Sequence, residues 1–310
     1  MTSPLELAEE AAVGAGASSG VVRLAVADPP LPSPGDLVAD RYRIVRRVCE
    51  GGMGVLFEAR HERLAQPVAV KVLRPRLARC HEVVQRFERE ARAAARLRSI
   101  HCARVLDVDA LPGGLPFIVF EYLVGHDLGA ELAARGALPI SFAIECALQA
   151  AAAMTEAHAC GIVHRDLKPS NLFLCRAPDG AAPLVKVLDF GVSRIDEPGE
   201  PRITGDFDSI GTPEYMSPEQ VRGASALDAR SDVWSLGVSL FELVTGRTPF
   251  AGSRTSVVAH IVEDPVPVLS SLCPGVPRVL DAIVHWMLEK DPAKRVPTMA
   301  EVARLLAGAR

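Results

Sequence analysis

Apolar and polar residues alternate along several short stretches in the first half of the chain, which is the pattern of half-buried β-strands. This alternation predicts five strands, over residues 41–48, 55–60, 66–73, 103–111 and 116–123. Between the third and fourth of them, residues 83–100 place apolar positions at helical spacing and are rich in Ala, Arg and Glu. The pattern therefore predicts a sheet-rich unit of five strands with one main helix.

Beyond residue 122 the periodicity becomes helical. Helices are predicted over residues 141–161, 229–246, 278–290 and 298–310. The second of these is apolar nearly all round, as expected for a helix buried in the middle of a domain. Thr298 followed three residues later by Glu301 is a capping-box pattern that marks the start of the last helix. The expected fold class is therefore α+β in two lobes, one built on a sheet and one mostly helical.

Residues 1–38 have a different composition, rich in Ala, Gly and Pro. Clustered prolines favour extended backbone and build no core, so this segment is predicted to be a flexible tail. We expect one domain over residues 40–310, with a first lobe at 40–122 and a second at 123–310.

Composition and charge exclude several classes of protein. Hydrophobic residues make up 49% and charged residues 23% of the chain, as in ordinary globular proteins, and the net charge of -4 disfavours a nucleic-acid partner. No apolar run is long enough for a membrane span, and the first residues do not resemble a signal peptide. The seven cysteines include no C-x-x-C pair, which is typical of reduced thiols in the cytoplasm.

The stretch "HRDLKPSN", residues 164–171, carries the most specific chemistry. It sets Asp166, Lys168 and Asn171 on one short loop between a helix and a strand. Phosphoryl transfer needs a carboxylate to accept the proton of the attacking hydroxyl, a cation near the transferred group and a ligand for Mg²⁺. These three side chains supply one of each.

Two further segments complete this chemistry. Asp189, in "KVLDFG", follows a predicted strand and is placed to hold Mg²⁺ near the phosphates of ATP. Lys71 lies on the third predicted strand, and the chain has only five lysines, of which two occupy positions useful for phosphate binding. A glutamate on the following helix should hold Lys71, and Glu88 and Glu90 are both candidates.

The stretch "VCEGGMGV", residues 48–55, has the composition of a loop that covers phosphates, since glycine lets the backbone approach a ligand closely. Its members, all expected to line the nucleotide site, are Val48, Cys49, Glu50, Gly51, Gly52, Met53, Gly54 and Val55. If the loop follows the G-x-G-x-x-G pattern, Cys49 stands where the first glycine belongs.

Taken together and in this order, the glycine loop, "VAVKVL", "HRDLKPSN", "DFG", "GTPEYMSPEQ", "SDVWSLG" and "DPAKR" resemble a bacterial serine/threonine protein kinase of the eukaryotic-like, Hanks-type family. The resemblance covers residues 42–309. It implies the two-lobed kinase fold and the transfer of the γ-phosphoryl group of MgATP to Ser and Thr hydroxyls of proteins in bacterial signal transduction.

The resemblance also implies roles for individual residues. Asp166 would be the catalytic base, Lys168 would contact the γ-phosphate, Asn171 and Asp189 would bind Mg²⁺, and Lys71 would pair with Glu90, whose register fits better than that of Glu88. The adenine of ATP would lie among Val55, Ala69, Phe120, Glu121, Leu123 and Phe173, with Phe120 guarding the back of the pocket. Glu219 would pair with Arg295, Asp232 would hold the backbone of the catalytic loop, and Thr212 would hydrogen-bond near Asp166 and Lys168.

Arg165 directly precedes the proposed base and, in such kinases, can bind a phosphate on the activation segment. The possible acceptors are Thr204, Ser209 and Thr212. Relatives often carry two threonines where this chain has Thr204 and Asp206. We expect Thr204 to be the main autophosphorylation site, with Asp206 either a fixed negative charge that partly orders the segment or an ordinary solvated residue.

The replacement of a glycine by Cys49 is expected to be tolerated, because the position lies at a strand end and the phosphate-facing glycines 52 and 54 remain. Its cost is about 0–1 kcal/mol, which lowers ATP affinity at most about fivefold. Cys49 is either neutral or a thiol sensitive to oxidants over the nucleotide site.

Three functions remain open at this stage. The leading one is an active kinase, with possible self-association for autophosphorylation between copies. A scaffold that binds nucleotide without turnover has only Cys49 in its favour, and a small-molecule phosphotransferase would lack the "GTPEYMSPEQ" segment. Relatives often continue into a membrane span, whereas this chain ends at Arg310, so we expect a cytoplasmic enzyme without a membrane span that takes its signal from partners or another kinase.

Overall fold

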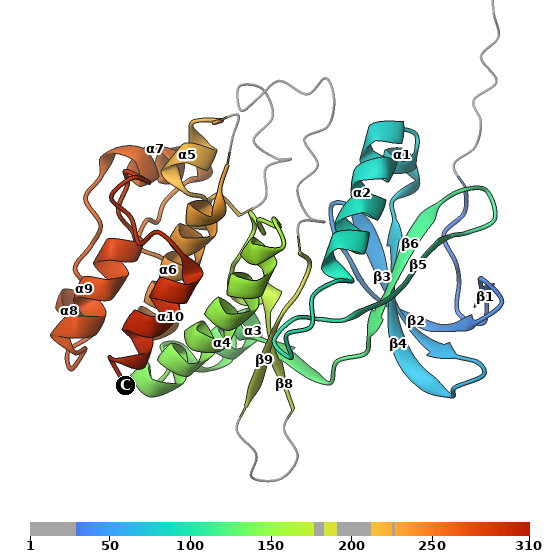
Figure 1. Cartoon of the computed structure of the whole chain (residues 1–310), viewed down its shortest axis with the longest axis horizontal. Coiled ribbons are helices and arrows are strands. Elements are labelled where there is room, and N and C mark those ends of the chain that lie inside the picture. Colours follow the sequence, from blue (N-terminus) through green and yellow to red (C-terminus); the bar gives the residue numbers. More distant parts are fainter. Residues whose placement is uncertain (1–28, 177–182, 191–211, 225–226) are drawn as a thin grey trace, which may run out of the picture.

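The computed structural model describes residues 29–176, 183–190, 212–224 and 227–310, and these residues form two lobes side by side (Figure 1). The first lobe is a sheet with two helices, and the second lobe is mostly helical. The two-lobed α+β fold predicted from the sequence is therefore confirmed. The lobe boundary predicted after residue 122 falls in the connection between the last strand of the first sheet and the next strand.

The first sheet is antiparallel throughout, with the strand order β1-β2-β3-β4-β6-β5. Its strands are β1 (Leu37–Val38), β2 (Tyr42–Glu50), β3 (Gly54–His61), β4 (Gln66–Leu73), β5 (Val105–Ala110) and β6 (Pro116–Glu121). The five predicted strands are present, and β1 is an addition. It pairs with β2 and buries Val38, so the ordered sheet begins inside the segment predicted as tail. Two residues are too short a strand to show alternation.

Helix α2 (His81–Ala94) packs against the sheet of the first lobe, and the short α1 (Pro75–Ala78) precedes it. Phe87, at the centre of α2, is fully buried against Leu73, Leu77 and Ile118. The helix ends earlier than the sequence predicted, because the chain turns after Ala94 and buries Leu97 in the core of the second lobe.

The second lobe contains eight helices and a small sheet among the described residues. The helices are α3 (Leu128–Arg135), α4 (Ile140–Ala159), α5 (Pro218–Val221), α6 (Ala229–Thr245), α7 (Arg254–Glu263), α8 (Leu269–Leu272), α9 (Arg278–Met287) and α10 (Met299–Ala307). Helix α6 is buried along almost its whole length, as its apolar sequence predicts. The Thr298 side chain accepts a hydrogen bond from the Glu301 N–H and so begins α10 where the capping pattern indicated.

A three-stranded sheet, β7-β8-β9, lies where the lobes meet. Its strands are β7 (Gly125–Asp127), β8 (Leu172–Cys175) and β9 (Leu184–Val187). The loop between α2 and β5 joins this sheet through a parallel bridge between Cys102 and Val187. Since β8 follows the catalytic loop and β9 leads to Asp189, this small sheet places the predicted chemistry between the two lobes.

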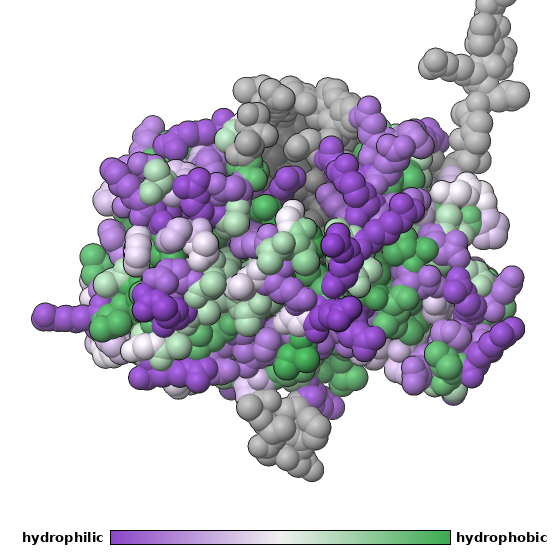
Figure 2. All heavy atoms as spheres, viewed as in Figure 1, coloured by the Kyte–Doolittle hydropathy of each residue, from purple (hydrophilic) through white to green (hydrophobic). Residues whose placement is uncertain are grey.

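The surface is that of an ordinary globular protein. Hydrophilic residues cover much of the face in Figure 2, with hydrophobic ones scattered between them. No helix in the described part of the chain is long and apolar enough to span a bilayer.

We predict that Phe87→Ala lowers the free energy of unfolding by about 3–5 kcal/mol, since it removes a fully buried ring from the contact between α2 and the sheet. Chemical denaturation measures this change. Gln85→Ala, an exposed position on the same helix, is the matched control and should stay within about 0.5 kcal/mol of the parent protein. Equal effects of the two substitutions would contradict the packing described for α2.

Candidate active site

An ion pair between the two lobes marks the candidate active site. Lys71, on β4, places its Nζ atom 2.7 Å from Oδ1 of Asp189, which follows β9. The lysine side chain is 12% exposed, so water screens this pair only partly. Two residues that are 118 positions apart in the sequence are thus brought into direct contact, as phosphate and metal chemistry at one site requires.

The electrostatics keep Asp189 ionised. Burial alone would raise the pKa of its carboxyl group, but the charge and the hydrogen bond of Lys71 outweigh burial and hold the pKa below its usual range. The residue also has a positive φ of 54°, a conformation that is uncommon outside glycine and is often found at functional sites. An ionised carboxylate here is suited to a cation.

The three catalytic-loop residues lie together. Lys168 Nζ is 2.9 Å from Oδ2 of Asp166. Asn171 donates from Nδ2 to the backbone oxygen of Asp166 at 2.7 Å and to its Oδ2 at 3.2 Å. These contacts aim the Asp166 carboxylate and leave the side-chain oxygen of Asn171 outside every hydrogen bond found among the described residues.

Asp232, in the first turn of α6, binds the backbone of the catalytic loop, as expected from the sequence. Its fully buried carboxylate accepts hydrogen bonds from the backbone N–H of His164 at 2.9 Å and of Arg165 at 2.8 Å. His158, on α4, contacts the same carboxylate at 2.8 Å. Arg165 has a positive φ of 66°, and the two backbone hydrogen bonds help to maintain that conformation.

Glu90 departs from expectation, because it does not pair with Lys71. Lys71 contacts Asp189 instead, and Oε2 of Glu90 is buried without a hydrogen-bond partner among the described residues. Burial raises the pKa of Glu90 to about 7, although the charges of Arg86, Arg165 and Arg89 act in the opposite direction. A raised pKa disfavours the ionised form of Glu90, which is the form that would pair with a lysine. Glu88, the other candidate, pairs with Arg92 at the surface.

The glycine loop joins β2 to β3. Val48, Cys49 and Glu50 end β2, residues 51–53 form the turn, and Gly54 and Val55 begin β3. Met53 packs against the cluster beneath α2.

Arg74, which sequence reasoning did not single out, fastens this loop. Its Nε donates to the oxygen of Gly51 at 2.7 Å, its backbone N–H donates to the oxygen of Met53, and its guanidinium pairs with Glu50. A single arginine just after a predicted strand carries no pattern that could have revealed this role.

The residues expected around adenine surround the connection between the lobes. Ala69 on β4 pairs in register with Phe120 on β6, and Phe173 lies on β8. Glu121 ends β6, and we call residues 121–124 the hinge. The backbone N–H and C=O of Leu123 form no hydrogen bond with the described residues, so both groups are available to a ligand.

Cys49 is exposed and lies opposite Leu56 in the β2–β3 ladder. Partial burial and the negative charge of Asp189 raise the pKa of its thiol, and Lys71 and Arg47 offset this only in part. Because the thiolate is the reactive form, the raised pKa favours the neutral interpretation of Cys49 over that of an oxidant-sensitive thiol.

The segment expected to bind peptide is anchored to the second lobe. The fully buried guanidinium of Arg295 makes a two-pronged ion pair with Glu219, at 2.8 Å and 3.0 Å, as the resemblance implied. Gln220 donates from Nε2 to the backbone oxygen of Arg165 and so ties this segment to the catalytic loop.

The activation-segment expectations are largely untested. Thr212 makes no hydrogen bond to Asp166 or Lys168 within the described residues, contrary to expectation. Thr204, Asp206 and Ser209 lie outside the described residues.

The site fits a magnesium ion in complex with phosphates. Asp189 offers a carboxylate and Asn171 an amide oxygen, which are ligand types that Mg²⁺ prefers. In the described part of the chain no cluster of three or more His, Cys, Asp or Glu side chains could hold a metal unaided.

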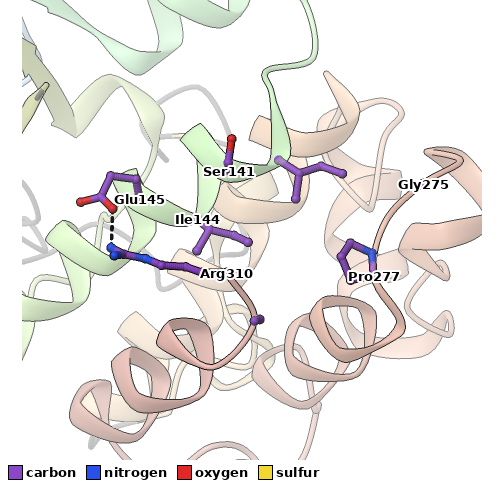
Figure 3. A pocket seen from close by; sticks show the side chains of 8 residues that line it. Ser141, Ile144, Glu145, Gly275, Pro277 and Arg310 are labelled. Carbon is purple, nitrogen blue, oxygen red and sulfur yellow. Dashed lines mark hydrogen bonds and ion pairs between the residues drawn. The ribbon is translucent and has the colours of Figure 1, made fainter.

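A second hollow lies at the far end of the second lobe. It has a volume of about 450 Å³ and lies between the start of α4, the segment before α9 and the end of α10. Ile140, Ile144 and Pro277 line it, and an ion pair between Glu145 and Arg310 crosses its edge (Figure 3). None of the candidate active-site residues borders it.

Comparison with known proteins agrees with this geometry. The protein kinase domain family matches residues 42–305. The serine/threonine-protein kinase Pkn1 of Myxococcus xanthus is 40% identical over 265 residues, which is 84% of this chain and 37% of Pkn1. The serine/threonine-protein kinase PknB of Mycobacterium tuberculosis is 41% identical over 270 residues, which is 86% of this chain and 42% of PknB. The chain thus spans less than half the length of these relatives.

Solved structures show the same fold. The crystal structure of the Mycobacterium tuberculosis PknI kinase domain superposes with a TM-score of 0.71 at 27% sequence identity. The match covers 90% of this chain and 100% of that one.

We predict that the stability of the protein depends on pH through Glu90. Its pKa is about 7 when folded and near 4.5 when unfolded, so the folded state binds the extra proton between these values. The contribution of Glu90 to stability therefore falls as the pH rises through this window. Glu90→Gln, which stays neutral, should gain melting temperature relative to the parent protein between about pH 5 and pH 8, as thermal unfolding would measure. A constant offset for Glu90→Gln across this window would contradict the burial of the Glu90 carboxyl group.

We also predict that Gly54 of the glycine loop cannot be replaced by a larger residue without loss of stability, whereas Gly52 can. A Cβ atom at Gly54 would lie 2.7 Å from the backbone oxygen of Val72, whereas one at Gly52 would meet nothing within 4 Å. Gly54→Ala should lower the free energy of unfolding by about 1–3 kcal/mol, as overpacking does. Gly52→Ala should leave it nearly unchanged. Denaturation of both variants tests this, and equal stability would refute the close contact at Gly54.

Proposed function

We propose, from the premise that this chain belongs to the protein kinase family, that it transfers the γ-phosphoryl group of ATP to serine and threonine hydroxyls of proteins, itself included. The observation that carries this proposal is the grouping of Asp166, Lys168 and Asn171 on one loop within the same site as the Lys71–Asp189 pair. A carboxylate, two ammonium groups and two oxygen ligands are the set that phosphoryl transfer requires.

The proton of the acceptor hydroxyl would go to Asp166. Lys168 and Asn171 both contact Oδ2 of the carboxylate and fix its orientation, so it accepts the proton without reorientation. Lys168 then balances the charge that develops on the transferred phosphoryl group. Reaction at a hydroxyl, rather than at water, depends on the substrate segment that Glu219 and Arg295 anchor.

Magnesium, when bound through Asp189 and Asn171, would neutralise charge on the phosphates of ATP. Lys71 would have to leave Asp189 to reach those phosphates, and Glu90 is then the carboxylate on the neighbouring helix α2 able to hold it. In this proposal the adenine is held by the hinge, with Val55, Ala69, Phe120 and Phe173 around the ring. The free backbone groups of Leu123 support that placement.

Regulation by phosphorylation is part of the proposal. In the part of the chain that the structure describes, the buried Nε of Arg165 has no hydrogen-bond partner, and a phosphate on Thr204 would supply acceptors for it. Because ATP is a cytoplasmic metabolite, the proposed reaction agrees with the cytoplasmic location expected from the sequence. Self-association between copies and the lack of a nucleic-acid partner stay predictions.

Incubation with radiolabelled ATP and Mg²⁺ tests the activity. The parent protein should label itself or a generic basic substrate protein, and Asp166→Asn should lower the rate about 10²- to 10⁴-fold, the usual share of a general base. Asp264→Asn, an exposed carboxylate after α7, is the matched control and should label normally. Peptide mapping of the labelled protein should find phosphate on Thr204.

A scaffold that binds nucleotide without turnover is the second candidate, and it predicts a different result. Neither the parent protein nor Asp166→Asn would then incorporate label, while MgATP would still raise the melting temperature. Absence of both label and thermal shift would refute nucleotide binding altogether.

A further inference from the structure

Three segments of the chain meet at Lys186, a residue of β9 that none of the proposed catalytic steps uses. Its side chain is 8% exposed. Its Nζ lies 2.8 Å from Oε1 of Glu121, the first hinge residue, and 3.2 Å from the backbone oxygen of Cys102, in the loop between α2 and β5. A lysine is rarely buried unless it is paired, so this position has a specific use for the charge.

The partner of Lys186 is held in place by further hydrogen bonds. Oε1 of Glu121 also accepts from the backbone N–H of Arg104 at 2.8 Å, and the Glu121 N–H donates to the Arg104 oxygen at 3.0 Å. On the other side, Ala103 donates to the oxygen of Val187 at 3.0 Å, and Val187 donates to the oxygen of His101 at 2.8 Å. The start of the hinge is thus fastened to β9 by side chain and backbone together.

This arrangement crosses from one lobe to the other. Glu121 ends β6 of the first sheet, while Lys186 belongs to the small sheet of the second lobe. The Lys186 ion pair fixes the point from which Tyr122 and Leu123 extend. Any rotation of the lobes about the hinge would therefore stretch this ion pair, whose lysine is buried and whose glutamate is 25% exposed, and a buried charge that loses its partner is costly.

We propose that Lys186 is a positioning residue for the adenine end of ATP. By holding Glu121, it fixes the backbone of the hinge at the edge of the base. The inference rests on the function proposed above, since it assumes that the base binds at the hinge. The contacts of Lys186 are with the first hinge residue, Glu121, and with the backbone oxygen of Cys102, so its action is directed at the base.

A competing explanation is that Lys186 acts on the metal site. Asp189 follows it by three residues, so loss of Lys186 could instead displace the carboxylate that holds Mg²⁺. The two explanations differ in which ligands they affect. Misplacement of the hinge weakens every ligand that contains adenine, with or without metal, whereas displacement of Asp189 weakens only the binding that Mg²⁺ supports.

The test is the affinity of Lys186→Met for adenosine, for ATP with a chelator and for MgATP, measured by calorimetry against the parent protein. All three dissociation constants should rise by a similar factor of about tenfold, which corresponds to 1.4 kcal/mol. The gain in ATP affinity on adding Mg²⁺ should be the same in both proteins.

Three further variants test whether a loss of affinity comes from the Lys186–Glu121 ion pair. Lys290→Met removes another lysine that donates to backbone oxygens, those of His260 and Ile261 in the second lobe, and should bind all three ligands as the parent does. Lys186→Arg keeps the charge and should recover part of the affinity. Glu121→Gln removes the other partner of the ion pair and should reproduce the loss, which keeps the inference testable if Lys186→Met folds poorly.

The outcomes are distinct. Unchanged affinities in Lys186→Met and Glu121→Gln, or a loss confined to MgATP, would overturn the inference while leaving the proposed kinase function intact. Failure of the parent protein itself to bind ATP or adenosine would instead overturn the proposed function, and the role of Lys186 with it.

Discussion

The structure depends on one buried carboxylate, that of Asp232. It is fully buried, and two backbone N–H groups of the catalytic loop and the ring of His158 satisfy it. A buried charge without such partners would be strongly unfavourable, so the loop and helix α6 hold each other in one arrangement. The positive φ of Arg165, which is costly in isolation, is maintained with the help of these hydrogen bonds. Asp166 directly follows the two residues that Asp232 binds, so its position depends on these hydrogen bonds.

The charged groups of the candidate active site form pairs that differ from those proposed for the protein with bound ATP. Lys71 neutralises Asp189, and Glu90 is left buried with a raised pKa among three arginines. Each of these groups would change partner when a nucleotide and a metal arrive. The positions of Asp166, Lys168 and Asn171 are fixed by contacts among these three residues, which include neither Lys71 nor Glu90.

The lobes are joined by more than the hinge. Lys186 and Glu121 form a partly buried ion pair at its start. The loop after α2 pairs with β9, and Glu156 of α4 accepts hydrogen bonds from the N–H groups of Arg98 and Ser99 in that loop. Charged and backbone contacts of this kind are directional, so they specify orientation where hydrophobic packing would specify only proximity.

The sequence alone determined the strands, the long helices and the residues that carry chemistry. Alternation and helical periodicity report burial directly, and the types and spacing of Asp166, Lys168, Asn171 and Asp189 report reactivity. Strand β1 escaped because its two residues cannot show a period, and helices α3 and α7 escaped because each buries only two residues, which gives no clear apolar face. Only the tertiary structure decided which charges meet. The partner of Lys71, the isolation of Glu90, the clamp formed by Arg74 and the burial of Lys186 all depend on how segments far apart in the chain approach, and local sequence carries no record of those distances.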